Sequence, residues 1–393
     1  MPNKKYKFET RAIREGNEAD SKTGSISPPI HLTSTYLQDG VGKDRGFDYS
    51  RASNPTRKRL EENIASLETG THGIAFSSGM AATTSLFQTL SKEDHVIISR
   101  NVYGGTFRMA TQVLSKQGLY FDFVDTRDLS NLYDKINPNT KWVFIETPTN
   151  PLLELTDIQA VADLCKDANI KLAVDNTFMS PYGQRPLDLG ADCVVHSSTK
   201  YIGGHSDVLG GAIVTRDDEL ASQLYFIQKS GGAVPSPFDC WLLLRSTKTL
   251  ALRVKKASEN ALLLAQMLDA HPSVLHTIYP GLQNHPQHQL AKRQQKTPSG
   301  ESIYGGIVSI NLGSKKKCDD FLSRSSVFSL AESLGGVESL VCVPYEMTHA
   351  DVPMDVKRSI NLVPELIRLS VGIEHIDDLM ADIEQALGNI KYE

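Results

Sequence analysis

The sequence is poor in the features that mark secreted, membrane-spanning and metal-binding proteins. Only five cysteines occur in 393 residues, no two of them closer than 24 positions, so they form neither a CxxC zinc pair nor a disulfide framework. No apolar run approaches the ~18 residues of a membrane span, and no apolar signal-peptide core follows the lysines after Met1. We therefore expect buried reduced thiols, no metal, no membrane contact and a cytoplasmic location.

The chain also lacks an excess of positive charge. Its 41 Lys and Arg residues against 46 Asp and Glu residues give a net charge of −5, which offers no bulk attraction to nucleic acid. Hydrophobic residues make up 40% and charged residues 22%, as in ordinary globular proteins. The length predicts two or three domains. We expect an N-terminal arm over 1–60, a large domain over 61–255 and a C-terminal domain over 256–393.

Short apolar runs alternate with helical patterns through the middle of the chain. Strands are predicted at 73–77, 95–99, 120–124, 142–146, 171–175, 193–196 and 211–215. Strands that alternate with helices indicate an α/β fold with a mostly parallel central sheet and helices on both faces. Little room is left for a helix near 200–209, where we expect an irregular, functional loop.

The flanking segments have a different character. Residues 1–60 are rich in proline and glycine, which predicts an irregular arm. Helices are expected at 217–230 and 238–271, the second a long bridge between domains. Further helices near 286–296, 315–324 and 375–389 mix with strands at 275–279, 306–311, 326–330 and 367–372. This pattern indicates a smaller α+β C-terminal domain with an antiparallel sheet.

Polar residues follow the predicted strands at the edge where open α/β sheets bind ligands. Gly79 and Met80 open a helix whose N-terminus suits a phosphate, although tight strand–helix packing explains the turn equally well. Asn150 lies between two prolines, where a simple Asx turn would suffice. Asp175 ends a buried strand and alone would be read as half of a structural salt bridge.

Lys200 is the most unusual of these strand-end residues. It follows an apolar strand, and the hydroxyl residues Ser197 and Thr199 lie just before it. A lysine of lowered pKa forms Schiff bases with carbonyl compounds. Pyridoxal 5′-phosphate needs a lysine for its aldehyde, an acid for its ring nitrogen, and hydroxyls with a helix N-terminus for its phosphate. Lys200 and Asp175, 25 positions apart on consecutive strand ends, can serve one such pocket.

Eight motifs in order resemble the Cys/Met-metabolism (transsulfuration) pyridoxal-phosphate enzymes. They are Tyr49-Ser50-Arg51, Ser78-Gly79-Met80, Tyr103-Gly104-Gly105, the run 146–151, the run 174–178, the run 197–205, the run 331–336 and the run 368–372. The resemblance covers about residues 8 to 390. It implies the fold-type I architecture of pyridoxal-phosphate-dependent transferases and an oligomer, at least a dimer and usually a dimer of dimers.

The resemblance also implies roles at individual positions. Lys200 is expected to form the Schiff base and to carry protons, with help from Tyr103 or Tyr49. Asp175 is expected at the ring nitrogen of the cofactor and Tyr103 on its ring face. The residues expected at the phosphate are Gly79, Met80, Ser197 and Thr199. Tyr49 and Arg51 are expected to reach the cofactor of the neighbouring subunit. Arg368, supported by Asn150 and Ser333, is expected to bind the substrate α-carboxylate.

The activity within the family depends on small pocket differences. Glu332 can attract a distal ammonium, and the segment 232–237 resembles γ-lyases more than γ-synthases. We therefore expect γ-elimination of cystathionine to cysteine, 2-oxobutyrate and ammonia, with hydrogen sulfide release as a side activity. The alternatives are γ-replacement of O-acyl-homoserine by cysteine and β-elimination. A dehydrogenase lacks its GxGxxG motif here, a binding protein without activity would not need Lys200, and the histidines are too scattered for a metal hydrolase.

Overall fold

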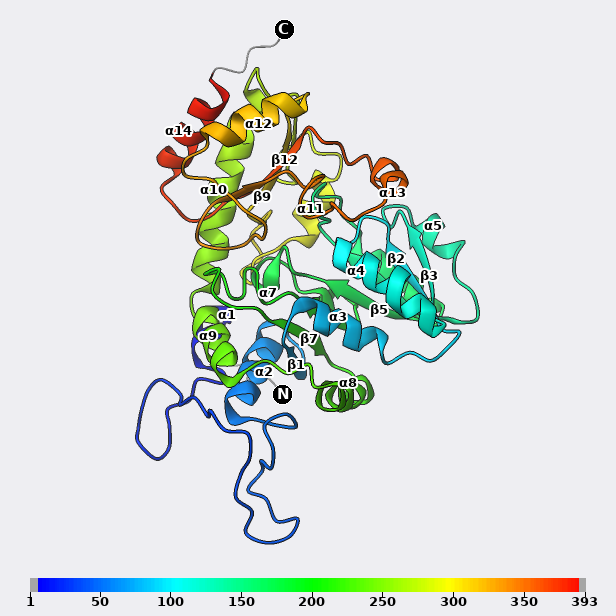
Figure 1. Ribbon diagram of the computed structural model, residues 1–393, viewed down its shortest axis with the longest axis vertical. Coiled ribbons are helices and arrows are strands. Elements are labelled where there is room, and N and C mark those ends of the chain that lie inside the picture. The colour runs from blue at the N-terminus through cyan, green and yellow to red at the C-terminus, as the bar shows by residue number, and fades with distance from the viewer. Residues whose placement is uncertain (1–5, 389–393) are drawn as a thin grey trace.

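The computed structural model describes residues 6–388 and contains two sheets (Figure 1). The first has the order β1-β7-β6-β5-β4-β2-β3, and β2 to β6 run parallel. Strand β7 is antiparallel to both β1 and β6, because a loop without a crossover helix returns the chain from β6. The mostly parallel sheet is thus confirmed. Its strands are β1 (His72–Phe76), β2 (His95–Ser99), β3 (Tyr120–Val124), β4 (Thr140–Glu146), β5 (Lys171–Asp175), β6 (Cys193–His196) and β7 (Gly211–Thr215).

Helices bury both faces of this sheet. Along β5, Ala173 packs with α3 (Gly79–Phe87) and α8 (Asp218–Gly231), whereas Leu172 and Val174 pack with α6 (Ile158–Asp167) on the opposite face. Nearer β7, α2 (Pro55–Leu67) and α9 (Pro237–Thr247) cover the same face as α6. Burial on both faces explains why these strands are almost uninterrupted apolar runs in the sequence.

The second sheet has the order β10-β11-β12-β9-β8. It is antiparallel, as expected, apart from the parallel pair β10 and β11. No strand is predicted at the position of β11, and the predicted strand at 326–330 contracts to the two residues of β10. The strands are β8 (His276–Ile278), β9 (Ile307–Asn311), β10 (Ser329–Leu330), β11 (Leu340–Cys342) and β12 (Leu366–Ser370).

The outer face of the second sheet is covered by α10 (Leu250–Ala270), α12 (Lys315–Arg324) and α14 (Ile376–Leu387). Ile367 and Leu369 of β12 point into this core, so Arg368 between them points to the opposite face. That inner face meets the first sheet's loops, where the Ser309 hydroxyl donates to the Pro151 carbonyl at 2.7 Å. The alternation along β12 therefore directs one arginine toward the junction of the two sheets.

The helix expected over 238–271 is broken into α9 and α10, which runs along the side of the molecule from the first sheet to the second (Figure 1). Arg253 provides the reason. Its guanidinium is buried and donates to the Ser246 carbonyl at 2.9 Å, an acceptor that an unbroken helix would use for its own backbone. The same side chain donates to the Tyr201 carbonyl at 2.7 Å.

The N-terminal arm is not wholly irregular. Residues Phe8–Arg14 form α1, and Phe8 is buried against the body of the protein. Residues 15–54 contain no helix or strand and extend away from the body as loops (Figure 1). The predicted domain boundaries at 60 and 255 both fall inside helices, α2 and α10, and the division into domains stays a prediction.

The remaining elements are short. They are α4 (Gly104–Arg108), α5 (Leu129–Tyr133), α7 (Ser180–Gly183), α11 (His288–Gln294) and α13 (Met354–Ser359), with a π-helical turn at Met109–Val113 and 3-10 turns at Leu114–Gln117 and Pro186–Leu189. All five cysteines are buried and unpaired, as predicted. Between residues 6 and 388, no helix combines the length and apolar character needed to cross a bilayer.

Candidate active site

A cavity of about 250 Å³ lies at the carboxyl ends of the parallel strands, between the first sheet and the second. This is the edge at which the sequence placed the ligand site. The cavity is lined by eleven of the thirteen predicted site residues: Gly79, Met80, Tyr103, Asn150, Asp175, Ser197, Thr199, Lys200, Glu332, Ser333 and Arg368. The two residues that do not line it, Tyr49 and Arg51, belong to the arm.

Lys200 lies in the loop between β6 and β7, with its amine in the cavity. Its Nζ donates to the Ser333 hydroxyl at 2.9 Å. Burial, reinforced by the positive charge of Arg368, lowers the pKa of Lys200 to about 8, although Glu332 acts in the opposite direction. A substantial fraction of the amine is therefore neutral near physiological pH and can act as a nucleophile or a base.

Asp175 is the last residue of β5. One of its carboxylate oxygens accepts the Thr177 backbone N–H at 3.0 Å. Burial raises the pKa of Asp175, whereas the hydrogen bonds of Thr177 and the charge of His196 favour the ionised form. The result is a partly exposed carboxylate at a strand end with room on its cavity side for a cationic ring nitrogen.

The N-terminus of α3 and the residues after β6 form a cradle suited to a phosphate. A Cβ on Gly79 would come within 2.8 Å of the Ser197 Cβ, so only glycine lets the helix approach this loop. The Ser197 backbone N–H donates to the Thr177 hydroxyl at 2.9 Å, which fixes the start of this loop beside the cavity that Ser197 lines. Free N–H groups at the start of α3, together with hydroxyls, favour an anion.

Arg368 reaches the cavity from β12 and is only 2% exposed. Its Nη1 donates to the Asn150 side-chain oxygen at 2.9 Å and its Nη2 to the Ser333 carbonyl at 2.7 Å. Its Nε has no hydrogen-bond partner among residues 6–388. A buried guanidinium with an unused donor at a cavity wall fits a carboxylate ligand.

Sequence reasoning missed Glu146, which also lines the cavity. One carboxylate oxygen accepts the Tyr103 N–H at 2.8 Å and the other accepts the Asn150 N–H at 3.1 Å. Burial and the adjacent charge of Asp175 raise the pKa of Glu146 well above its ordinary value. The available signal was its position as an acid that ends a buried strand, the same signal that identified Asp175.

Two predicted residues stand at the mouth of the cavity. Tyr103 is 40% exposed and lies beside Met80, and Glu332 is exposed. In contrast, the arm keeps Tyr49 and Arg51 away from this chain's cavity. The Arg51 guanidinium lies 5.5 Å from the centre of the Tyr49 ring and donates to the Lys229 carbonyl. Their expected role in a neighbouring subunit stays a prediction.

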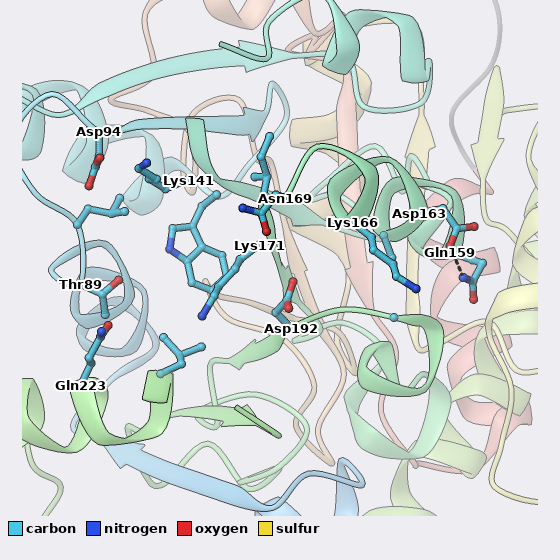
Figure 2. A pocket seen from close by; sticks show the side chains of 16 residues that line it. Thr89, Asp94, Lys141, Gln159, Asp163, Lys166, Asn169, Lys171, Asp192 and Gln223 are labelled. Carbon is cyan, nitrogen blue, oxygen red and sulfur yellow. Dashed lines mark hydrogen bonds between the residues drawn. The ribbon is translucent and has the colours of Figure 1, made fainter. Parts of the chain in front are cut away.

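A larger cavity, of about 700 Å³, opens at the opposite, amino-terminal ends of the strands (Figure 2). Lysines and aspartates line it together, including Lys166 and Asp192. The Lys171 amine at its wall is bound to Asp217 at 2.6 Å. This cavity contains none of the predicted site residues, so size does not identify the site here.

The donor set of the smaller cavity fits pyridoxal phosphate. A lysine of lowered pKa, a strand-end acid and a helix N-terminus with hydroxyls come from separate elements and converge on one space. Fold and site together define a pyridoxal-phosphate-dependent enzyme of fold type I. The chain belongs to the family described as Cys/Met metabolism PLP-dependent enzymes, whose sequence pattern matches residues 9–388.

Relatives within this family carry different activities. The chain is 48% identical over 384 residues to a cystathionine gamma-lyase of Bacillus subtilis, covering 98% of this chain and 100% of the relative. It is 47% identical to a cystathionine beta-lyase of Lactococcus lactis, covering 97% and 98%, and 48% identical to a cystathionine gamma-synthase of Mycobacterium bovis, covering 96% of each. A solved cystathionine gamma-lyase from Lactobacillus plantarum superposes with a TM-score of 0.94 at 43% identity, covering 98% of this chain and 99% of that one.

Proposed function

We propose that this enzyme is a cystathionine γ-lyase, which converts L-cystathionine and water to L-cysteine, 2-oxobutyrate and ammonia. The observation that carries the proposal is the pair of opposite charges along the cavity. Arg368 lies buried at its wall and Glu332 is exposed at its mouth. Each end of cystathionine carries an ammonium and a carboxylate, so Arg368 would bind the carboxylate of the reacting end and Glu332 would attract the ammonium of the other end. This match supports cystathionine as the substrate, and the likeness of the segment 232–237 to γ-lyases favours γ-elimination.

The cofactor would be held by the residues that converge on the cavity. Lys200 would bind its aldehyde carbon, Asp175 its ring nitrogen, and Tyr103 would cover its ring. Gly79, Met80, Ser197 and Thr199 would surround its phosphate. Bound pyridoxal phosphate supplies a protonated ring that accepts electrons from the substrate Cα–H bond.

Arg368 and Lys200 have different roles toward the substrate: Arg368 orients it and Lys200 transfers its protons. Arg368, held by Asn150 and Ser333, orients the substrate carboxylate so that Cα faces the Lys200 amine. With a pKa of about 8, the Lys200 amine can accept a proton from Cα and release it at another carbon near neutral pH. These proton movements allow the bond from Cγ to sulfur to break with loss of cysteine.

The neighbouring subunit completes the proposed site. Tyr49 and Arg51 belong to the segment 15–54, which extends from the body as loops (Figure 1), and neither residue lines this chain's cavity. We place Arg51 on the phosphate of the partner's cofactor and Tyr49 beside it. A dimer is then the smallest active unit, and a dimer of dimers is the expected assembly.

Product analysis distinguishes the proposal from its two alternatives. Purified enzyme incubated with L-cystathionine alone should release 2-oxobutyrate and cysteine in equal amounts. Pyruvate and homocysteine would identify a β-lyase instead. Faster turnover of O-acyl-homoserine with cysteine than of cystathionine would identify a γ-synthase. Hydrogen sulfide release from cysteine or homocysteine is expected as a slower side reaction.

A further inference from the structure

A glutamate and a histidine that contact each other are completely buried beneath the cofactor cavity. Glu68, the C-cap residue after α2, is 0% exposed, and His196, the last residue of β6, is 1% exposed. The His196 Nε2 and Glu68 Oε1 atoms are 2.5 Å apart. The other Glu68 oxygen has no hydrogen-bond partner within residues 6–388. The cost of removing polar or charged groups from water offsets most of the attraction within a buried pair, so a gain in stability is weak grounds for this contact.

The pair lies on the face of the sheet opposite the cavity. Cys193 and Val195 of β6 pack into the core on the α3 side, whereas Val194 packs on the α2 side. By this alternation His196 points toward α2. Its backbone, however, continues directly into Ser197, the first residue of the proposed phosphate cradle.

The same glutamate also holds the end of the neighbouring strand. The Asn176 side chain, which follows Asp175 directly, donates to Glu68 Oε1 at 2.9 Å. Asn176 further donates to the Gln184 carbonyl at 2.8 Å and accepts from the Gln184 amide at 3.0 Å. One carboxylate oxygen therefore contacts the residue that follows Asp175 and the residue that precedes Ser197.

We propose that Glu68 and His196 are a positioning pair for pyridoxal phosphate. They fix the carboxyl ends of β5 and β6 so that Asp175 and Ser197 face the cofactor together. This inference rests on the proposed roles of Asp175 and Ser197. In metal sites, partners that orient a ligand from behind have the same function, and their loss typically weakens binding about 10–100-fold.

The charges around Asp175 support this arrangement. The nearby charge of His196 favours ionised Asp175, whereas burial raises the pKa of Asp175. The other acid at this edge is Glu146, opposite Asp175 on β4, and Lys200 and Arg368 line the same cavity. Glu68 holds the imidazole of His196 in place from the side remote from the cavity.

The test compares cofactor binding in Glu68→Gln, His196→Gln and a matched control, His95→Gln, in the full-length protein. His95 is also a buried histidine of the first sheet near an acid, with Asp122 at 3.5 Å, but it starts β2 at the opposite edge. Pyridoxal phosphate is removed from each protein, and its dissociation constant is measured by titration, together with the melting temperature of the apoprotein.

We expect the dissociation constant to rise about 10-fold or more in Glu68→Gln and His196→Gln, and to change less than about twofold in His95→Gln. Unchanged affinity in both site variants, or an equal loss in His95→Gln, would overturn the proposal even if melting temperatures fall. If neither variant folds, NMR of the wild-type protein with isotope-labelled histidine provides the test. The His196 resonance should shift when pyridoxal phosphate binds. An unchanged resonance would refute the proposed positioning role of His196. Wild-type product analysis tests the proposed activity separately.

Discussion

Glu146 and Asp175 lie directly opposite each other, as the last residues of the neighbouring parallel strands β4 and β5. Both line the cofactor cavity, and the charge of Asp175 helps to raise the pKa of Glu146. The two acids differ in their contacts. Both Glu146 oxygens accept backbone N–H groups, from Tyr103 and Asn150, whereas Asp175 is anchored through Thr177. Asp175 is thus available to a ligand, and Glu146 holds the turns that carry two other site residues.

Substitution of Glu146 by Gln should disturb those turns. The amide can accept only one of the two backbone N–H groups and leaves the other unpaired, at a cost of about 1–3 kcal/mol. We expect a lower melting temperature and kcat/KM reduced about 10-fold or more. Glu62→Gln on the exposed face of α2 is the matched control and should behave as wild type. Wild-type kinetic constants in Glu146→Gln would show that Glu146 does not hold these turns in their active arrangement.

Most of the fold could be predicted from the sequence because both faces of the first sheet are buried. Strands β2, β3, β5, β6 and β7 have the predicted ends. The apolar runs of β2, β5, β6 and β7 are almost wholly buried, whereas β3 lies at the edge of the sheet and is only partly buried. The break between α9 and α10 was not located from the sequence, because it depends on the contact of the buried Arg253 guanidinium with the Ser246 carbonyl, which helical periodicity does not reveal. Strand β11 was missed, although the apolar run 340–343 resembles the runs of the strands that were predicted.

Arg368→Lys should weaken substrate binding more than it slows chemistry. A lysine ammonium cannot reproduce the planar donors that contact Asn150, Ser333 and a carboxylate at once. Charge-assisted hydrogen bonds contribute about 1.5–3 kcal/mol, so KM for cystathionine should rise about 10–100-fold with a smaller change in kcat. Arg216→Lys, at a half-exposed surface arginine, is the control. Equal KM values for Arg368→Lys and wild type would exclude carboxylate binding by Arg368.

Glu332→Gln tests recognition of the distal ammonium. Because Glu332 is exposed, its attraction is screened and is about 1 kcal/mol or less. KM for cystathionine should therefore rise up to about fivefold, and KM for cysteine, which has no second ammonium, should not change. Glu338→Gln, at a nearby exposed glutamate, serves as the control. A parallel rise for both substrates would show that Glu332 does not select the longer one.

Lys200 should destabilise the apoprotein in a pH-dependent way. Its pKa falls from 10.5 to about 8 on folding, so the folded chain bears the cost of a buried charge below about pH 8. As the pH rises from about 8 to 10.5, the folded amine becomes neutral first and the cost disappears. Denaturant unfolding should show Lys200→Met apoprotein more stable than wild type by about 3 kcal/mol at neutral pH, with no gain above pH 10.5.

An exposed lysine serves as the control for the Lys200→Met experiment. Lys316→Met replaces an exposed lysine of α12 and should give no comparable gain. A stability difference for Lys200→Met that is independent of pH would show that the Lys200 amine is not desolvated in the folded chain.

The residues that line the cavity were easier to predict from the sequence than the residues that hold them in place from behind. Lys200 and Asp175 could be identified as polar side chains that follow or end apolar strands, whereas Arg368 was assigned from the family resemblance. Glu68 and His196 were not identified, because their contact joins residues 128 positions apart and exists only once α2 packs against the sheet. Long-range pairs of this kind leave no periodic signal in one sequence.

Lys200 is the residue on which the proposed cofactor site depends. Borohydride reduction of the enzyme with its pyridoxal phosphate bound, followed by proteolysis and mass spectrometry, measures this directly. The pyridoxyl group should be found on the peptide that contains Lys200, and Lys200→Ala should carry no label and have no turnover. A label on any other lysine, or full activity in Lys200→Ala, would contradict the account.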